Sequence, residues 1–179
     1  MKTYVALLRG INVSGQKKIR MADLKESLES YGLHKVTTYI QSGNVVFESE
    51  KANVAQLEKA IHEVILADFG FSVPTLVTTG EVLAQILDSN PFNDQSEANR
   101  IYFVLLKQPP EQVLKGKFET EQFVNEDFHI TDICVYLCCK KGYGNAKLNN
   151  NLIERKLKVE ATTRNLKTMQ KLIAMAEES

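Results

Sequence analysis

Three short stretches of the sequence place arginine, asparagine or glutamine directly beside an apolar run. They read LLRGIN (7–12), YIQSGNVVF (39–47) and ATTRNLKT (161–168). Arginine side chains and the free amides of a helix N-terminus bind phosphate, and asparagine and glutamine side chains hydrogen-bond to bases and sugars. These residue types therefore indicate a polar site for a phosphate-containing ligand, either a nucleotide or a single-stranded nucleic acid.

The last stretch also carries a local electrostatic conflict. Thr162 or Thr163 can cap a C-terminal helix, which places Arg164 in the first turn of that helix. An arginine there opposes the helix dipole. We therefore expect Arg164 to meet either an acid, such as Glu154 or Glu160, or an anionic ligand at the helix N-terminus.

The segment GINVSGQKK (10–18) resembles the phosphate-binding loop of NTPases only in its glycine spacing. Such a loop needs lysine directly after the second glycine, and then a serine or threonine to hold magnesium. Here Gln16 occupies the lysine position, and Lys17 and Lys18 follow it. We therefore expect a glycine-assisted loop whose amides and lysines meet an anion, and no NTP-binding loop.

No metal site, cofactor or nucleophile is predicted. Cys134, Cys138 and Cys139 crowd onto one predicted strand, whereas zinc sites need separated pairs in tight turns. An odd, clustered set is typical of a cytosolic protein with reduced, buried thiols. The three histidines have no acid or nucleophile at a recognisable motif spacing, so catalytic residues stay unassigned.

The elements that must position these residues follow from hydrophobic periodicity and turn signals. The first half is predicted to contain a strand at 3–9, a helix at 21–31, hairpin strands at 35–40 and 44–49, a helix from 54 to about 68 that is capped by Asn53, and an edge strand at 72–79. The order β-α-β-β-α-β is that of a ferredoxin-like split βαβ sandwich.

A connecting helix capped by Thr78 and ending near Asp88 and a loop at 90–99 follow the first repeat. The second half is then predicted to repeat the order β-α-β-β-α, with a strand at 100–108, a short helix begun by Pro109-Pro110, a hairpin of FHIT and ICVYLCC, and helices at 147–158 and 163–177. We therefore predict an α+β fold of two ferredoxin-like β-α-β-β-α repeats, with antiparallel sheets and helices packed on them. The first repeat and a connecting helix span 1–89, the second repeat with its C-terminal helix spans 90–179, and both belong to one compact unit.

The composition is that of a globular protein with an uneven distribution of charge. Lys plus Arg and Asp plus Glu both total 22, which argues against a strongly basic nucleic-acid coat protein. No apolar run approaches the roughly 20 residues of a membrane span, so we expect a cytoplasmic protein with no membrane partner. Residues 9–20 hold four bases and no acid, residues 88–132 hold nine acids and four bases, and residues 140–171 hold nine bases and two acids. Such asymmetry marks either an anion-binding face or a solvated surface.

Three longer segments, YVALLRGINVSGQKKIRMADLKESLESYG, VTTYIQSGNVVF and KLNNNLIERKLKVEATTRNLKTMQKL, carry a resemblance. Together they resemble the domain of unknown function 1697 family, a set of small, mostly bacterial proteins, over nearly the whole chain. The resemblance implies two β-α-β-β-α repeats with C-terminal helices exchanged between them, and it implies no reaction. Leu166 stands where the family usually has tryptophan, which weakens a base-stacking role at that position.

The polar motif positions of the family fall on the residues that we assign to the ligand-binding site. These residues are Arg9, Asn12, Gln41, Ser42, Asn44, Lys147, Glu154, Arg155, Thr163, Arg164 and Asn165. We expect them to form a polar pocket or groove between the repeats, flanked by Lys17 and Lys18.

Two other interpretations stay open beside this binding module. One is an enzyme acting on a small anionic substrate, with Glu154 or a histidine as acid or base and Arg9 or Arg164 as the anion clamp. The other is a buried polar network that only ties the repeats together and binds no ligand.

Overall fold

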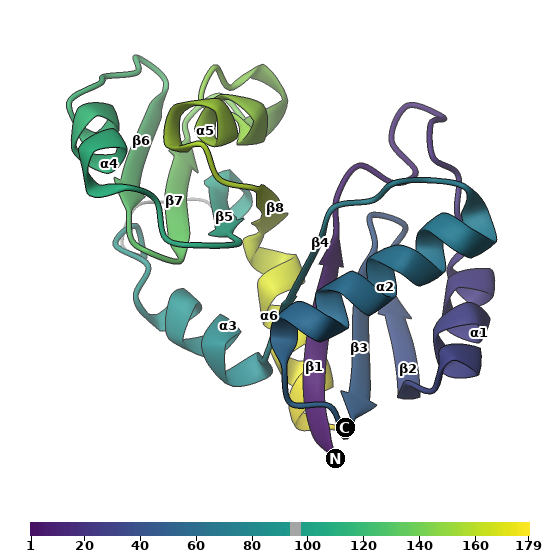
Figure 1. The fold of residues 1–179 in the computed structure, drawn as a ribbon. Coiled ribbons are helices and arrows are strands. Elements are labelled where there is room, and N and C mark those ends of the chain that lie inside the picture. The colour runs from purple at the N-terminus through teal and green to yellow at the C-terminus, as the bar shows by residue number, and fades with distance from the viewer. Residues whose placement is uncertain (94–97) are drawn as a thin grey trace. The chain divides into compact units, whose positions relative to one another are not determined.

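The computed structural model describes residues 1–93 and 98–179, so the predicted loop at 90–99 lies partly outside the described residues. The chain divides into two compact units, one of Met1–Ala84 with Lys171–Ser179 and one of Gln85–Gln170. Each unit contains a four-stranded antiparallel sheet, and the protein is a mixed α+β fold (Figure 1). Within the described part of the chain, no helix combines the length and the apolar character needed to cross a bilayer.

The first unit follows the predicted order of elements closely. Its strands and helices are β1 (Lys2–Leu8), α1 (Met21–Tyr31), β2 (His34–Tyr39), β3 (Asn44–Ser49), α2 (Val54–Phe69) and β4 (Thr75–Thr78). The strand order is β2-β3-β1-β4, so β4 is an edge strand, as Pro74 predicted.

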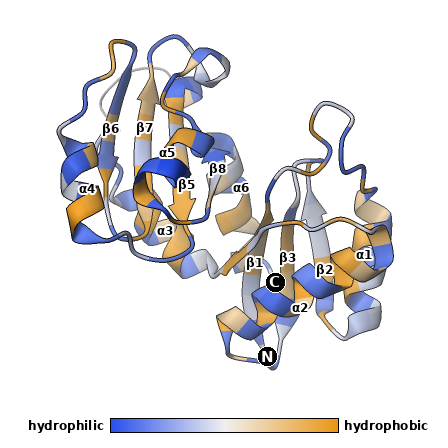
Figure 2. Ribbon diagram, turned by 45° about the horizontal axis from the view of Figure 1, so that its top comes forward, coloured by the Kyte–Doolittle hydropathy of each residue, from blue (hydrophilic) through white to orange (hydrophobic). Residues whose placement is uncertain are grey.

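One apolar core holds α1 and α2 against the sheet of the first unit. Leu24 and Leu28 lie one turn apart on α1 and are fully buried, because residues four apart share a helix face. They belong to the same buried cluster as Tyr4 and Phe47, whose rings stack with centroids 5.8 Å apart. The hydropathy colours in Figure 2 show α2 with alternating apolar and polar stripes, as expected for a helix that packs by one face.

The boundaries of these two helices come from local signals. Asn53 caps α2 by accepting a hydrogen bond from the Gln56 backbone N–H at 3.1 Å, which confirms the predicted cap. Gly32 ends α1 in a left-handed conformation with φ of 105°.

The second unit repeats the order of the first. Its elements are a 3-10 turn (Ala98–Arg100), β5 (Ile101–Leu106), α4 (Gln112–Glu119), β6 (Glu126–Ile130), β7 (Cys134–Cys139), a 3-10 turn (Tyr143–Asn145), α5 (Asn150–Leu157) and β8 (Ala161–Asn165). The strand order β6-β7-β5-β8 corresponds to that of the first sheet. Two further helices, α3 (Gly80–Asp88) and α6 (Leu166–Glu177), each begin in one unit and end in the other.

The largest departure from the predicted elements concerns residues 161–165. This segment is the strand β8 and not the start of the last helix, which begins only at Leu166. The strand pairs antiparallel with β5, with Arg164 opposite Phe103. Asn165 caps α6 by accepting from the Thr168 N–H at 2.9 Å, so neither Thr162 nor Thr163 is the cap. Tertiary pairing with a distant strand overrides the local capping signal.

Three other helix starts also differ from prediction. Thr79, and not Thr78, accepts the hydrogen bond from the Val82 N–H at the start of α3. The helix α4 begins at Gln112, after Pro109-Pro110 and the N-cap residue Glu111. The helix α5 begins at Asn150, because the Asn149 side chain accepts from the Leu152 N–H at 3.0 Å.

Candidate functional site

The loop between β1 and α1, residues 9–20, has an unusual backbone. Its residues with positive φ are Gly10 (74°), Asn12 (54°), Ser14 (51°), Gly15 (74°) and Lys17 (46°). Non-glycine residues rarely adopt this conformation, because their Cβ atom crowds the backbone. Surrounding contacts must therefore hold the loop, and backbone strain of this kind is common at functional sites.

Asn12 supplies the contacts that hold the loop. Its Nδ2 donates to the carbonyl oxygens of Ile19 at 2.9 Å and Gln41 at 2.8 Å, and its Oδ1 accepts from the Ile19 N–H at 2.8 Å. The structure thus brings the predicted site residues Asn12 and Gln41 together through the backbone of Gln41, whose side chain is exposed. The amide of Asn12 serves to fix two loops to each other.

The turn between β2 and β3 packs closely against the end of β1. Gly43 has φ of 88°, and a Cβ atom there would lie 2.7 Å from the Cβ atom of Leu8. Asn44 is fully buried, and its Nδ2 donates to the Tyr39 carbonyl at 2.9 Å and to the Ser42 Oγ at 3.1 Å. Ser42 and Asn44 therefore shape this turn.

Residues 9–20 and 39–44 together form a surface that we call the loop platform. Two of its bases, Lys18 and Arg20, are exposed, Arg20 lies 3.9 Å from the carboxylate of Asp23, and Arg9 is half-buried. The Nζ atom of Lys17 donates to the Ser72 carbonyl at 2.7 Å, which anchors the far end of the loop. The platform presents positive charge on a backbone that is fixed in place.

In the second unit, Arg164 lies on β8 and is only 7% exposed. Its NH1 atom donates to the Thr162 Oγ1 at 2.8 Å and to the Thr163 carbonyl at 2.9 Å. Burial lowers the pKa of the Arg164 guanidinium to about 10, because desolvation disfavours the charged form. Since Arg164 is not in the first turn of a helix, the predicted conflict with the α6 dipole does not arise.

A connected set of hydrogen bonds joins α5 to β8. Asn150 is its centre: the Nδ2 donates to the Glu154 Oε1 at 2.9 Å and to the Ala161 carbonyl at 3.1 Å. The Asn150 Oδ1 accepts from the Thr163 Oγ1 at 2.8 Å, and the Tyr143 hydroxyl accepts from the Asn150 N–H at 3.0 Å. The site candidates Glu154 and Thr163 therefore lie in one network, in which the polar groups bond to one another.

The remaining candidates of the second unit lie around this network. Lys147 and Arg155 are exposed, and the backbone N–H of Lys147 donates to the Glu126 Oε1 at 2.6 Å. Asn165 is the cap of α6. The predicted residues therefore lie in two groups. One group lies on the loop platform, and the other lies on α5, on β8 and just before α5.

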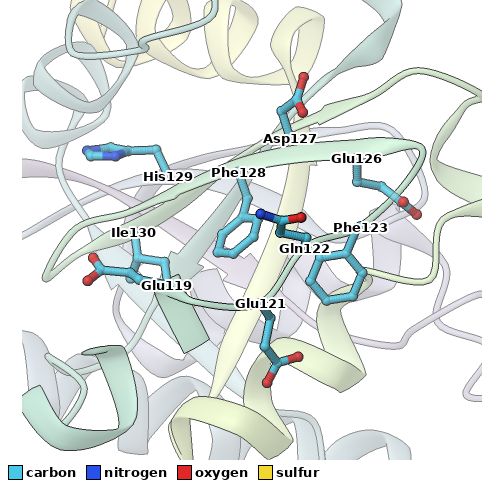
Figure 3. Close-up of a pocket in the computed structure, with 9 residues that line it drawn as sticks. All are labelled: Glu119, Glu121, Gln122, Phe123, Glu126, Asp127, Phe128, His129 and Ile130. Carbon is cyan, nitrogen blue, oxygen red and sulfur yellow. The ribbon is translucent and has the colours of Figure 1, made fainter. Parts of the chain in front are cut away.

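A pocket of about 570 Å³ lies along β6 in the second unit, where no site was predicted from the sequence. Figure 3 shows its lining, which comes from the end of α4, the following loop and β6 itself. The excess of acidic over basic residues in 88–132 was the feature of the sequence that could have indicated this pocket.

The fold and these polar surfaces define an α+β protein of two similar units. The family described as Protein of unknown function (DUF1697) matches residues 1–136, and the chain belongs to this family. No match is found among curated proteins. The structure of the conserved bacterial protein SP0830 from Streptococcus pneumoniae is similar, with a TM-score of 0.78 and 25% identity over 99% of both chains.

Proposed function

We propose that this protein is a binding module that contacts the phosphates of single-stranded nucleic acid through the loop platform. One observation carries the proposal: residues 9–20 hold four bases and no acid, on a loop that Asn12 fixes in a strained conformation. A fixed loop loses little conformational entropy on binding, which favours contacts between an anion and its exposed basic side chains.

The exposure of the loop favours a polymer over an enclosed small molecule. Ser14, Gly15, Gln16 and Lys18 are all exposed, and the loop projects from the end of the first sheet (Figure 1). Such a projecting surface can follow the phosphates of an extended strand, whereas small ligands bind in concave sites.

Stacking of bases on the sheet, as in RNA-recognition motifs, is not supported. That mode needs aromatic side chains on an open sheet face. Both faces of β1 are buried, since Tyr4, Val5, Ala6 and Leu7 are each at most 1% exposed, and Phe47 is fully buried on β3. Contacts to phosphate at the loop platform are therefore the mode that we propose.

The second group of candidates supports a different role. Glu154 bonds to Asn150, and its Oε1 also accepts from the Ala161 N–H at 3.3 Å. Since these bonds tie α5 to β8, we propose that Glu154 and Thr163 of the second group belong to a structural network, in line with the open alternative of a polar network without a ligand.

The ferredoxin-like character of the two repeats is part of the same proposal. Each unit runs strand, helix, two strands, helix, strand, and the two sheets have corresponding strand orders. This order supports two ferredoxin-like units of common design.

Fluorescence anisotropy of labelled single-stranded RNA and DNA across a salt series tests the proposal. Binding should weaken with salt, with a logarithmic slope of about −0.7 for each phosphate contacted. The double variant Lys18→Gln/Arg20→Gln should bind more weakly and with a shallower slope, because two exposed bases of the loop are neutralised.

The control is Lys59→Gln, which neutralises a base on α2 that is 76% exposed and lies outside the platform. It should bind as the unchanged protein does. Absence of binding at low salt, or equal loss in the platform variant and the control, would exclude the platform as the nucleic-acid site.

A further inference from the structure

The strand β6 is an edge of the second sheet, since β7 is its one neighbour in the strand order β6-β7-β5-β8. The Lys140 N–H donates to the Asn125 carbonyl at 2.9 Å, and the Thr131 N–H donates to the Cys134 carbonyl at 2.9 Å. In an antiparallel pair, residues alternate between facing the partner strand and facing away. The residues of β6 whose backbone N–H and C=O point away from β7 are therefore Glu126, Phe128 and Ile130.

Three of the features that commonly prevent strand addition are absent from β6. Natural edge strands are often protected by lysine, proline or a β-bulge. The sequence EDFHI contains neither lysine nor proline, and its register with β7 is continuous from Glu126 to Ile130. The Glu126 side chain is 5% exposed and accepts from the Lys147 N–H, so it is held inside the unit and does not block the edge.

The pocket of about 570 Å³ runs along this same edge. Figure 3 shows the Phe123 and Phe128 rings on one side of β6, with Asp127 and His129 on the other. The two rings pack with centroids 5.8 Å apart, so the pocket has an aromatic surface. Aromatic faces attract cationic groups as well as apolar ones.

The acids around the pocket outnumber by one the lysines that pair with them. Residues 119–130 contain four acids and no lysine or arginine. Lys115 lies 4.0 Å from Glu119 on the same helix, and Lys140 and Lys156 lie 3.1 and 2.7 Å from Asp127 and Glu121. Exposed pairs of this kind contribute little stability, so an incoming cation can replace these lysines.

We propose that the β6 edge binds an extended peptide segment rich in lysine or arginine, which joins the second sheet as an additional strand. The outward backbone groups of β6 supply the hydrogen bonds of strand addition. Alternate side chains of the peptide enter the pocket, where a cation meets the phenylalanine rings and the carboxylates of Glu119 and Glu121. A second copy of this chain is a poorer occupant of the same edge, because it brings the same acids to the contact.

The probe is a labelled octapeptide of alternating lysine and threonine, and binding is measured by fluorescence anisotropy with the full chain. A second version of this peptide carries N-methyl groups on alternate residues. The methylated residues lose their backbone N–H donors, and the side-chain charges are unchanged. The unmodified peptide should bind, and a methylated version whose modified residues face β6 should bind at least about tenfold more weakly. Two methylated peptides are prepared, one modified at the odd residues and one at the even residues. In one of them the modified residues must then face β6.

Amide exchange by NMR tests the geometry directly. In the free protein, the amides of Glu126, Phe128 and Ile130 should exchange faster than those of Asp127 and His129, and bound peptide should slow this first set. A protein charge variant, Glu119→Lys/Glu121→Lys, should weaken binding by about tenfold, since two attractive contacts become repulsive. The control Glu50→Lys changes an exposed acid of the first unit and should leave the affinity unchanged.

Each of three results would overturn the proposal. The first is equal binding of the unmodified peptide and both methylated peptides, and the second is unchanged exchange of the outward amides at saturating peptide. The third is self-association of the protein with protection of the β6 amides in the absence of peptide, which would make a second copy the occupant.

Discussion

At the scale of single residues, the asparagines show that one side-chain type can either bind a ligand or hydrogen-bond to the backbone of a loop. Asn12 and Asn44 were assigned to a ligand site because their amides can read a base or a sugar. In the structure Asn12 bonds to the backbone at Ile19 and Gln41, and Asn44 bonds to Tyr39 and Ser42. The donor and acceptor pair that recognises a base equally satisfies the free N–H and C=O groups of a loop.

Arg164 provides a direct test of a structural role. We expect Arg164→Ala to lower the free energy of unfolding by about 3 kcal/mol, because it removes charged hydrogen bonds to Thr162 and Thr163 and leaves a cavity in a buried region. Urea denaturation followed by circular dichroism measures the loss. Arg155→Ala, an exposed arginine of the same unit, should change stability by about 0.5 kcal/mol or less. Equal, small effects of both substitutions would argue for a ligand-binding role of Arg164 instead.

At the scale of elements, β8 is the segment where local signals and the fold disagree. The sequence EATTRNLKT contains two threonines before a helical pattern, which is a typical capping signal. The same threonines are β-branched and favour a strand. Pairing with β5 from Ala161 to Asn165 decides the outcome, and it moves the helix start to Leu166.

Because Asn165 is the N-cap residue of α6, its substitution should change the stability of the protein. Asn165→Ala should cost about 1 kcal/mol, because the Thr168 N–H loses its acceptor, whereas Asn165→Asp should cost little, since a carboxylate also accepts and favours the helix N-terminus. Thermal and urea unfolding of the two variants measure the difference. If Asn165→Asp were as destabilising as Asn165→Ala, the capping role would be wrong.

At the scale of the whole molecule, the second unit contains the tyrosines and cysteines whose pKa values are raised. Burial, and then the charge of Cys134, raises the pKa of Tyr136 to about 12, and the Tyr136 hydroxyl donates to the Ile86 carbonyl at 2.8 Å. Burial, followed by Glu126 and Cys138, raises the pKa of the Cys139 thiol to about 12. Cys139 is a buried free thiol, in agreement with the prediction that the cysteines are buried.

The stability contributed by Tyr136 and Cys139 should therefore fall at high pH, whereas Arg164, with its pKa lowered to about 10, contributes a smaller change of the opposite sign. In the unfolded chain a cysteine and a tyrosine ionise near their ordinary pKa values of 9.0 and 10.0, whereas the folded groups stay neutral up to about 12. The stability due to these neutral groups is fully present below pH 9.0 and is lost as the pH rises toward 12. Urea midpoints at a series of pH values should show this decline.

The variant Cys139→Ala isolates one contribution to this alkaline decline. It should be less stable at neutral pH, because a buried side chain is shortened, and its midpoint should decline less steeply above pH 9.0. An unchanged slope in the variant would mean that Cys139 does not contribute to the alkaline loss.

Elements whose signals are local could be predicted from the order of residues along the chain. Periodic leucines with a terminal glycine indicated α1, Asn53 with Gln56 indicated the start of α2, and the polar turn at 41–43 separated β2 from β3. Local charge counting likewise located the basic loop at 9–20 that carries the proposed function. These features depend on residues within one or two turns of one another, so composition and spacing are sufficient to find them.

Features that depend on residues far apart in the chain became apparent only in the folded protein. There ATTRN is a strand beside β5, Asn150, Glu154 and Thr163 form one network, and acids of residues 119–130 line a pocket along the edge strand β6. The physical reason is that backbone hydrogen bonds between strands and the burial of a side chain form only when distant segments meet. The intrinsic preference of a residue for helix or strand includes neither the free energy of these hydrogen bonds nor that of burial.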